Sequence, residues 1–181
     1  AQQQFTNTTT GTGAGDGLVI GITGGEDSIF WNQENTNMLF ATNNTERLRI
    51  DSGGRILIGH TASQDVYTTS TLQIQGSTAA TSTLSLLGQG RSPYLSLGAT
   101  GSGSLGGVVA VSADDRLGQL TFCGADGTDV NTHSCSVSGY VDGSVSGNTV
   151  PGRLVFKTST EASEVERVRI TSAGSLQVKG G

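Results

Sequence analysis

Short apolar segments separated by polar turns recur along the whole chain. The first series lies at residues 18–22, 29–31, 38–40, 48–50 and 56–58. A second series lies at 94–97, 108–111, 120–122, 135–141, 154–156, 168–170 and 176–178. Nearly every gap holds Gly, Asn, Asp or Ser, and no window of about eleven residues sustains the apolar spacing of a helix. The pattern predicts an all-β chain of short strands joined by tight turns.

One thirteen-residue pattern occurs twice. Residues 46–58 read ERLRIDSGGRILI and residues 166–178 read ERVRITSAGSLQV, with six identical positions. Three further positions keep an apolar residue, and each copy follows another short apolar segment and a polar turn. A structural repeat separated by 120 residues is typical of a modular, elongated protein.

Each copy has the alternation of a β-hairpin. Leu48 and Ile50 are expected on one face of the first strand, with Arg47 and Arg49 on the other. The Gly-containing turn at 51–54 then reverses the chain, and Ile56 and Ile58 return to the apolar phase. The second copy predicts the same hairpin, so that Ile50 and its counterpart Ile170 both point inward.

A single hairpin of this size is marginally stable in water. Its apolar face holds about four side chains and must cover another surface. Because each segment carries so few apolar residues, we expect that surface to be the same hairpin in other copies of the chain. The sequence therefore predicts a homo-oligomer with a thin axial core.

The repeat divides the chain into four parts. Residues 1–16 form a polar leader, either a linker or a strand that needs a partner. Residues 17–60 form a first β-repeat module, 61–83 a Ser/Thr-rich connector and 84–181 a second, longer module.

Composition and charge exclude several classes of protein. Gly, Thr and Ser make up about 40% of the chain, whereas hydrophobic residues make up 34%, which is lean for one large core. Disorder is not expected, because apolar residues recur regularly. A net charge of −5 with ten basic residues argues against nucleic-acid binding. No stretch approaches the roughly 18 apolar residues of a membrane helix, so no membrane insertion is expected.

The candidate chemical motifs each have a plainer structural interpretation. The glycines at 11, 13, 15 and 17 suggest a phosphate loop, but they follow no strand and open no helix, which favours a flexible leader. Residues 126–131 could surround Ca²⁺, yet the ligand count favours a turn. His60 and His133 stand without metal-ligand spacing. Neither metal, cofactor nor catalytic residue is assigned.

Three further groups of residues leave two interpretations each. Cys123 and Cys135 either pair or, as favoured, remain separate small residues. Six arginines in or beside the repeats either bind an anionic polysaccharide or, as favoured, pair with neighbouring carboxylates. Trp31, Tyr94 and Tyr140 either stack on sugars or fill the core of a thin fibre. Asp114 and Asp115 are expected to form a turn before the next strand.

The repeat motifs resemble those of a known group of proteins. The run FATNNTERLRIDSGGRILIG (40–59) resembles repeats in tail fibres and other virion appendages of tailed bacteriophages, especially phages of aquatic bacteria. The segments SPYLSLG (92–98), LGQLTFCGADGTD (117–129) and PGRLVFKTS (151–159) are similar to the longer module of the same proteins. The resemblance covers roughly two-thirds of the chain. It implies an intertwined homotrimeric β-fibre at a virion surface, used for host attachment or as a structural spacer.

These observations lead to one preferred function and two alternatives. We expect a non-enzymatic structural or adhesive fibre segment of a phage virion, located at the virion surface. Its expected partners are two further copies of the chain, other virion proteins, and a polysaccharide or protein of the host surface. The first alternative is a subunit of a bacterial extracellular filament or adhesin. A polysaccharide depolymerase is the least favoured, because no catalytic motif is visible.

Overall fold

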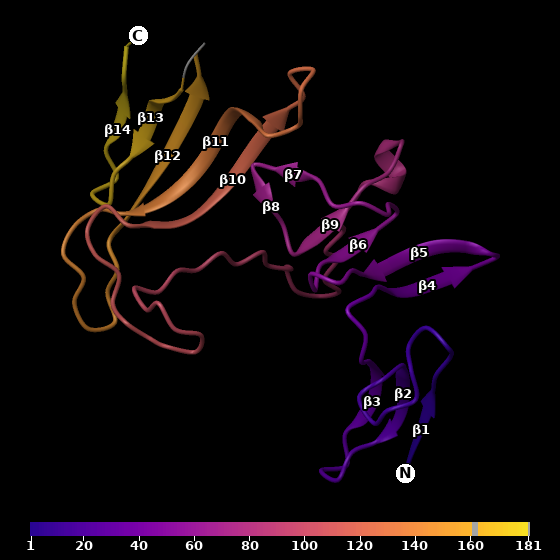
Figure 1. Cartoon of the computed structure of the whole chain (residues 1–181). Helices are drawn as coiled ribbons and strands as arrows, with labels where there is room; N and C mark the ends of the chain where they lie inside the picture. The colour runs from indigo at the N-terminus through magenta and orange to yellow at the C-terminus, as the bar shows by residue number, and fades with distance from the viewer. Residues whose placement is uncertain (161–162, 181) are drawn as a thin grey trace. The chain divides into compact units, whose positions relative to one another are not determined.

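The computed structural model describes residues 1–160 and 163–180 (Figure 1). Strands dominate these residues, and Ala79–Thr81 forms a single 3-10 turn, so the predicted all-β class is confirmed. No helix in the described ranges is long and apolar enough to cross a membrane. The chain divides into two compact units, the first made of residues 1–64 and 69–84, the second of 65–68 and the chain from Ser85 onward.

The first unit opens with a small antiparallel sheet in the order β1-β2-β3. Its strands are β1 (Gln2–Phe5), β2 (Leu18–Ile22) and β3 (Ser28–Asn32). The polar leader thus contains a strand, since β1 pairs with β2 along four residues. The loop between them is ordered by Asn7 and Asp16, whose carboxylate accepts the backbone N–H of Gly13 at 2.7 Å.

A second sheet in the first unit holds the first copy of the repeat. In sheet order its strands are β4 (Met38–Thr42), β5 (Thr45–Ile50), β6 (Ile56–Ile58) and β9 (Leu72–Ile74). The first three are antiparallel, whereas β9 returns to pair parallel with β6. Between β6 and β9, the short strands β7 (Asp65–Val66) and β8 (Thr68–Thr69) pair with each other.

The second unit is a five-stranded antiparallel meander in which spatial order follows chain order (Figure 1). Its strands are β10 (Arg116–Gly124), β11 (Thr132–Val141), β12 (Gly152–Ser159), β13 (Glu164–Ile170) and β14 (Leu176–Val178). A segment without strand or helix, residues 85–113, precedes β10. We call residues 85–113 the arm.

The two repeat copies form equivalent hairpins, as predicted. Leu48 faces Ile58 across β5 and β6, and Val168 faces Val178 across β13 and β14, exactly 120 positions later in both strands. The likeness extends to the preceding strand, because Phe40 pairs with Leu48 as Phe156 pairs with Val168. The repeated unit is therefore a three-stranded meander rather than a hairpin alone.

A β-bulge interrupts the same position of both meanders. In β5 the pairing passes from Leu48 to Glu46 and leaves Arg47 as the extra residue. Arg167 is the extra residue of β13. The Arg47 guanidinium consequently donates to the hydroxyl of Thr42 at 3.0 Å, whereas Arg49 binds a carboxylate. The expectation that both arginines lie together on one face is therefore wrong, because a bulge shifts the alternation by one residue.

Within the two repeat copies, the best-buried side chains lie on the face where the arginines were expected. Leu57 is 1% exposed and pairs across the sheet with Arg49, and Val155 is also 1% exposed and pairs with Arg169. The aliphatic stem of an arginine covers apolar neighbours while its guanidinium stays polar. Ile56, expected to be an inward residue, is 36% exposed within the single chain.

The turn of the repeat requires glycine at one position. Gly54 and Gly174 both have a left-handed backbone, with φ of 80° and 79°, and each N–H closes the turn on the carbonyl three residues earlier. A side chain at such a position is disfavoured by about 1–2 kcal/mol. We predict that Gly174→Ala lowers the free energy of unfolding of the second unit by about that amount, measured by equilibrium chemical denaturation.

The matched control is Gly124→Ala. A Cβ at either Gly124 or Gly174 would meet no atom within 4 Å, so the two variants differ in backbone conformation and not in crowding. Gly124→Ala should stay within about 0.5 kcal/mol of the original chain. Equal effects of the two substitutions would contradict the conformational explanation.

Candidate interaction surface

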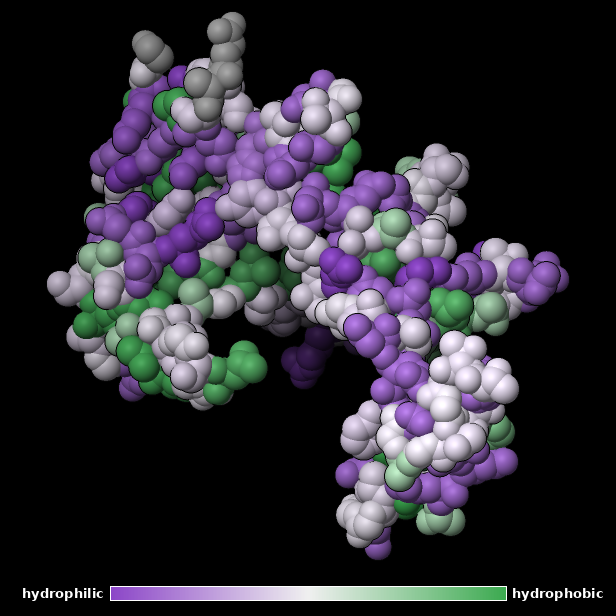
Figure 2. Space-filling model, viewed as in Figure 1, coloured by the Kyte–Doolittle hydropathy of each residue, from purple (hydrophilic) through white to green (hydrophobic). Residues whose placement is uncertain are grey.

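One face of the second sheet carries large apolar side chains, most of which are exposed among the residues that the structure describes. Along its strands these residues are Leu120, Phe122, Val137, Leu154, Phe156, Val168, Ile170, Leu176 and Val178. Phe122, Ile170 and Val178 are 55%, 41% and 73% exposed. We call these nine residues the second apolar face. Figure 2 shows hydrophobic surface exposed on the second unit.

The first copy of the repeat carries the same face. Its residues form two rows across the four strands: Phe40, Leu48, Ile58 and Ile74, and then Met38, Ile50, Ile56 and Leu72. These eight residues are the first apolar face. None of them is fully buried, although all eight are large apolar side chains. The face that the sequence predicts to point inward is therefore exposed in the single chain.

The opposite face of each meander is held by a bidentate ion pair. The Arg49 guanidinium binds both carboxylate oxygens of Glu46, at 2.6 and 2.8 Å. Arg169 binds Glu166 in the same manner, with both distances 2.6 Å. The favoured prediction of carboxylate pairing is confirmed for these arginines. Two planar groups matched in this way hold each other in one orientation.

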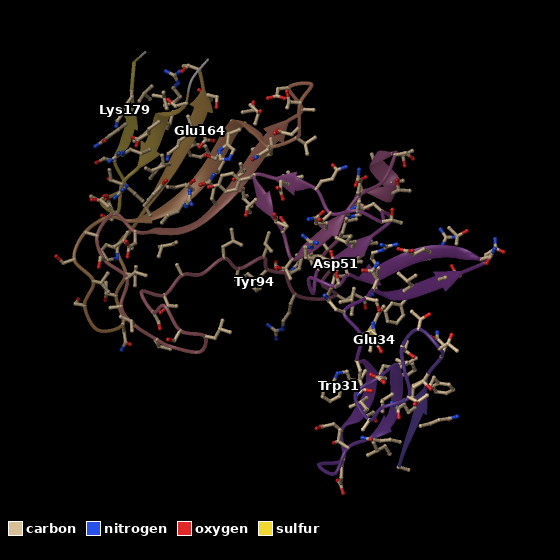
Figure 3. All side chains as sticks on the ribbon, in the orientation of Figure 1. Trp31, Glu34, Asp51, Tyr94, Glu164 and Lys179 are labelled. Atoms are coloured by element: carbon tan, nitrogen blue, oxygen red, sulfur yellow. The ribbon has the colours of Figure 1, made fainter. Side chains whose placement is uncertain are left out.

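These ion pairs shift the acidity of their carboxyl groups. Hydrogen bonds from Arg169, and further ones from Lys179 at 3.2 Å, lower the pKa of Glu166 from 4.5 to about 2. The Arg49 hydrogen bonds lower the pKa of Glu46 in the same direction. Both glutamates are thus charged over the whole neutral range. Figure 3 shows Lys179, which directly follows the final strand of the second sheet.

A second polar cluster lies at the other end of the same face. Arg153 bridges two carboxylates, Asp114 at 2.7 Å and Asp142 at 3.3 Å, and its guanidinium lies 5.1 Å from the centre of the Tyr140 ring. The Lys157 ammonium donates to the Tyr140 hydroxyl at 2.9 Å. This cluster links the turn before β10 to β11 and β12, and Asp114 occupies a turn, as predicted.

The register also gathers residues that appear isolated in the sequence. His133 pairs with Cys123, and its Nδ1 lies 3.8 Å from the Glu164 carboxylate. The strand register thus brings residues from three strands, β10, β11 and β13, near His133. Burial raises the pKa of the Cys123 thiol, which disfavours the nucleophilic thiolate. Both cysteines are free thiols, as favoured.

The other candidate motifs form turns. The Asp126 carboxylate accepts the N–H groups of Thr128 and Asp129 and the hydroxyl of Thr132, which is the predicted turn. Within residues 1–160 and 163–180, no three His, Cys, Asp or Glu side chains are grouped to hold a metal ion. In the glycine-rich loop the Asp16 carboxylate already occupies the N–H of Gly13.

The aromatic residues differ in their surroundings. Trp31 is 58% exposed and lines a shallow pocket with Gln2, Gln4 and Val19 on the first small sheet. Tyr94 is 86% exposed on the arm, where Figure 3 shows it. Tyr140 instead packs beneath two cationic side chains. Trp31 and Tyr94 therefore fill no core within the single chain.

Known proteins give no direct guide to these surfaces. No family model matches the chain, and no curated protein is significantly similar to it. The likeness of the repeats to phage appendage proteins remains an expectation based on the motifs alone. What the structure adds is the geometry of the two faces.

The Glu166 pair predicts how stability depends on pH. A carboxyl group whose pKa falls from 4.5 to about 2 on folding stabilises the fold above pH 4.5, and that contribution is lost as the pH falls toward 2. We predict that Glu166→Gln is less stable than the original chain at pH 7, and that the difference shrinks to zero near pH 2. Equilibrium denaturation at several pH values measures this difference.

The control for this experiment is Glu164→Gln, which removes a carboxylate two residues away that lies 3.8 Å from the His133 ring and makes no Arg or Lys ion pair among the described residues. Glu164→Gln should alter the pH dependence of the free energy of unfolding less than Glu166→Gln does. A Glu166→Gln variant with the same stability as the original chain at every pH would show that the ion pair does not stabilise the fold.

Proposed function

We propose that this chain is a structural or adhesive segment of a bacteriophage fibre, and that it assembles as a homotrimer through its two apolar faces. The observation that supports this most directly is the duplication of one surface. Both meanders have the same pairing, the same bulge and the same Arg–Glu pair, and both leave the apolar side uncovered.

A sheet with one uncovered apolar face needs a second layer. Exposed apolar patches of this kind mark interaction sites in folded proteins. The core within the single chain is small, since the buried hydrophobic residues among those described are Val19, Leu57, Val141 and Val155. A closed ring of three copies buries three equivalent faces around one axis and leaves no face open.

The polar faces then point outward in the proposed fibre. The charged residues of these faces pair with one another, Glu46 with Arg49 and Glu166 with Arg169. These faces are therefore suited to rigidity and solubility. The turns between strands would be the positions for contact with a host surface, since loops tolerate variation and commonly carry recognition. On this proposal the activity is mechanical and adhesive, not enzymatic.

The proposed interface predicts the outcome of one substitution. The original chain should scatter light as about three chain masses at micromolar concentration. Phe40 is 48% exposed in the single chain, so Phe40→Asp should leave the isolated fold intact. Three carboxylates would however meet in an apolar layer of the trimer, where unpaired charge is very costly. Phe40→Asp should therefore be monomeric while keeping its β-type circular dichroism.

The control is Ser52→Asp, which adds the same charge in the exposed turn of the same hairpin. This variant should assemble normally. A Phe40→Asp chain that still forms the trimer, or an original chain that is a stable monomer, would overturn the proposed interface.

The location of the protein tests the function itself. An antibody raised against this chain and coupled to gold should decorate appendages of intact phage particles in negative-stain electron microscopy. Label on free or cell-bound filaments would favour the bacterial filament alternative. Release of reducing sugar from host polysaccharide by the purified chain would contradict a purely structural role.

A further inference from the structure

The arm carries large apolar side chains that are exposed in the single chain. Eight large apolar residues of the arm are exposed: Leu86, Leu87, Tyr94, Leu95, Leu97, Leu105, Val108 and Val109. The only charged residue between 85 and 113 is Arg91. The arm is rich in Gly and Ser, as flexible linkers are, but a linker of that kind has no need of large apolar side chains. The arm therefore has the properties of an interface segment.

One residue fixes the arm to the second sheet. A Cβ built at Gly118 would lie 2.6 Å from the Cβ of Leu97, so Leu97 occupies the space that a side chain at Gly118 would take. Gly118 alternates with Leu120 and Phe122 along β10, which places this contact on the second apolar face. The arm thus already meets that face at one point.

Next to this contact the same face has an empty notch. Gly139 lies directly across from Gly118 and pairs on its other side with Leu154. A Cβ at Gly139 would meet no atom within 4 Å. The row that contains Leu154 and Ile170 therefore has a gap of about one side chain, which the chain does not fill for itself.

Beyond Leu97 the arm forms a closed loop with an apolar tip. The N–H of Gly101 donates to the carbonyl of Val109 at 3.0 Å, and the Thr100 hydroxyl accepts the N–H of Val109 at 3.0 Å. At the tip, Leu105 and Val108 are almost completely exposed to solvent. We call residues 100–109 the knob. Internal hydrogen bonds order this loop before it binds anything, which reduces the entropic cost of docking.

We propose that the knob of one copy docks on the second apolar face of a neighbouring copy, with Leu105 in the notch at Gly139. The knob and the nine residues of that face are all uncharged, so the two surfaces match in chemistry. Because the knob and the notch are different parts of one chain, each copy gives one contact and receives one. Such a head-to-tail contact closes into a ring when the rotation between copies is one third of a turn.

This inference rests on the proposed homo-oligomer and adds the residues that join its copies. A cross-linking experiment tests it on the full chain with Cys123 and Cys135 replaced by Ser. One chain carries Leu105→Cys and a differently tagged chain carries Gly139→Cys, and the two are refolded together and oxidised. A disulfide-linked dimer that contains both tags is the expected product. A control pairs Leu105→Cys with Gln177→Cys, which lies on the polar face beside Arg169, and should give no such dimer.

A second measurement does not depend on engineered cysteines. Leu105→Ala should raise the chain concentration needed for half-assembly by more than about tenfold, because each of the three contacts in a trimer would lose one buried leucine. Ser104→Ala, the neighbouring position, should leave it unchanged. If trimers form without the mixed disulfide and Leu105→Ala does not weaken them, the proposed docking of the knob is wrong. The proposed trimer would not be affected by that result. A monomeric original chain would overturn both.

Discussion

A single layer of β-sheet has two faces. In each meander of this chain, side chains are buried on the polar face, whereas the apolar face stays largely exposed. The first apolar face and the second apolar face each present rows of Leu, Ile, Phe or Val with no second layer against them. Burial of such side chains is the main force that stabilises folded proteins. While these faces stay exposed, the two meanders depend on other contacts within the chain for their stability.

Part of that stability comes from the polar faces. Leu57 and Val155 are the best-buried residues of the two meanders, and each lies beside an arginine that is fixed by a glutamate. The ion pair is therefore a packing device as much as an electrostatic one, because it keeps the arginine stem over its apolar neighbour. The bulge is what makes it possible. Glu46 and Arg49 are three positions apart, so in a regular strand they would point to opposite faces.

The sequence was sufficient for the hairpins and insufficient for the details of their faces. Alternation of apolar residues around a glycine turn is a local signal, and it correctly placed Leu48 and Ile50 opposite Ile58 and Ile56. The bulge at Arg47 cannot be read from the alternation of apolar residues. The spacing of Glu46 and Arg49 does indicate it, because two residues three positions apart can pair on one face only if the strand is irregular. The neighbourhood of His133 could not be found in this way, because it depends on the register between strands that are up to 31 residues apart in sequence.

The second unit shows how one meander can acquire a new contact without losing its own structure. Strands β12 to β14 repeat β4 to β6, and β10 and β11 extend the same apolar face by two strands. Those two strands bring the paired glycines Gly118 and Gly139, which interrupt a row that is otherwise filled by Leu154 and Ile170. A glycine in a strand interior normally weakens the strand and often marks the close approach of another chain segment. Gly118 already has such a segment in Leu97, so the vacant Gly139 beside it is the position where a further side chain has most to gain by packing.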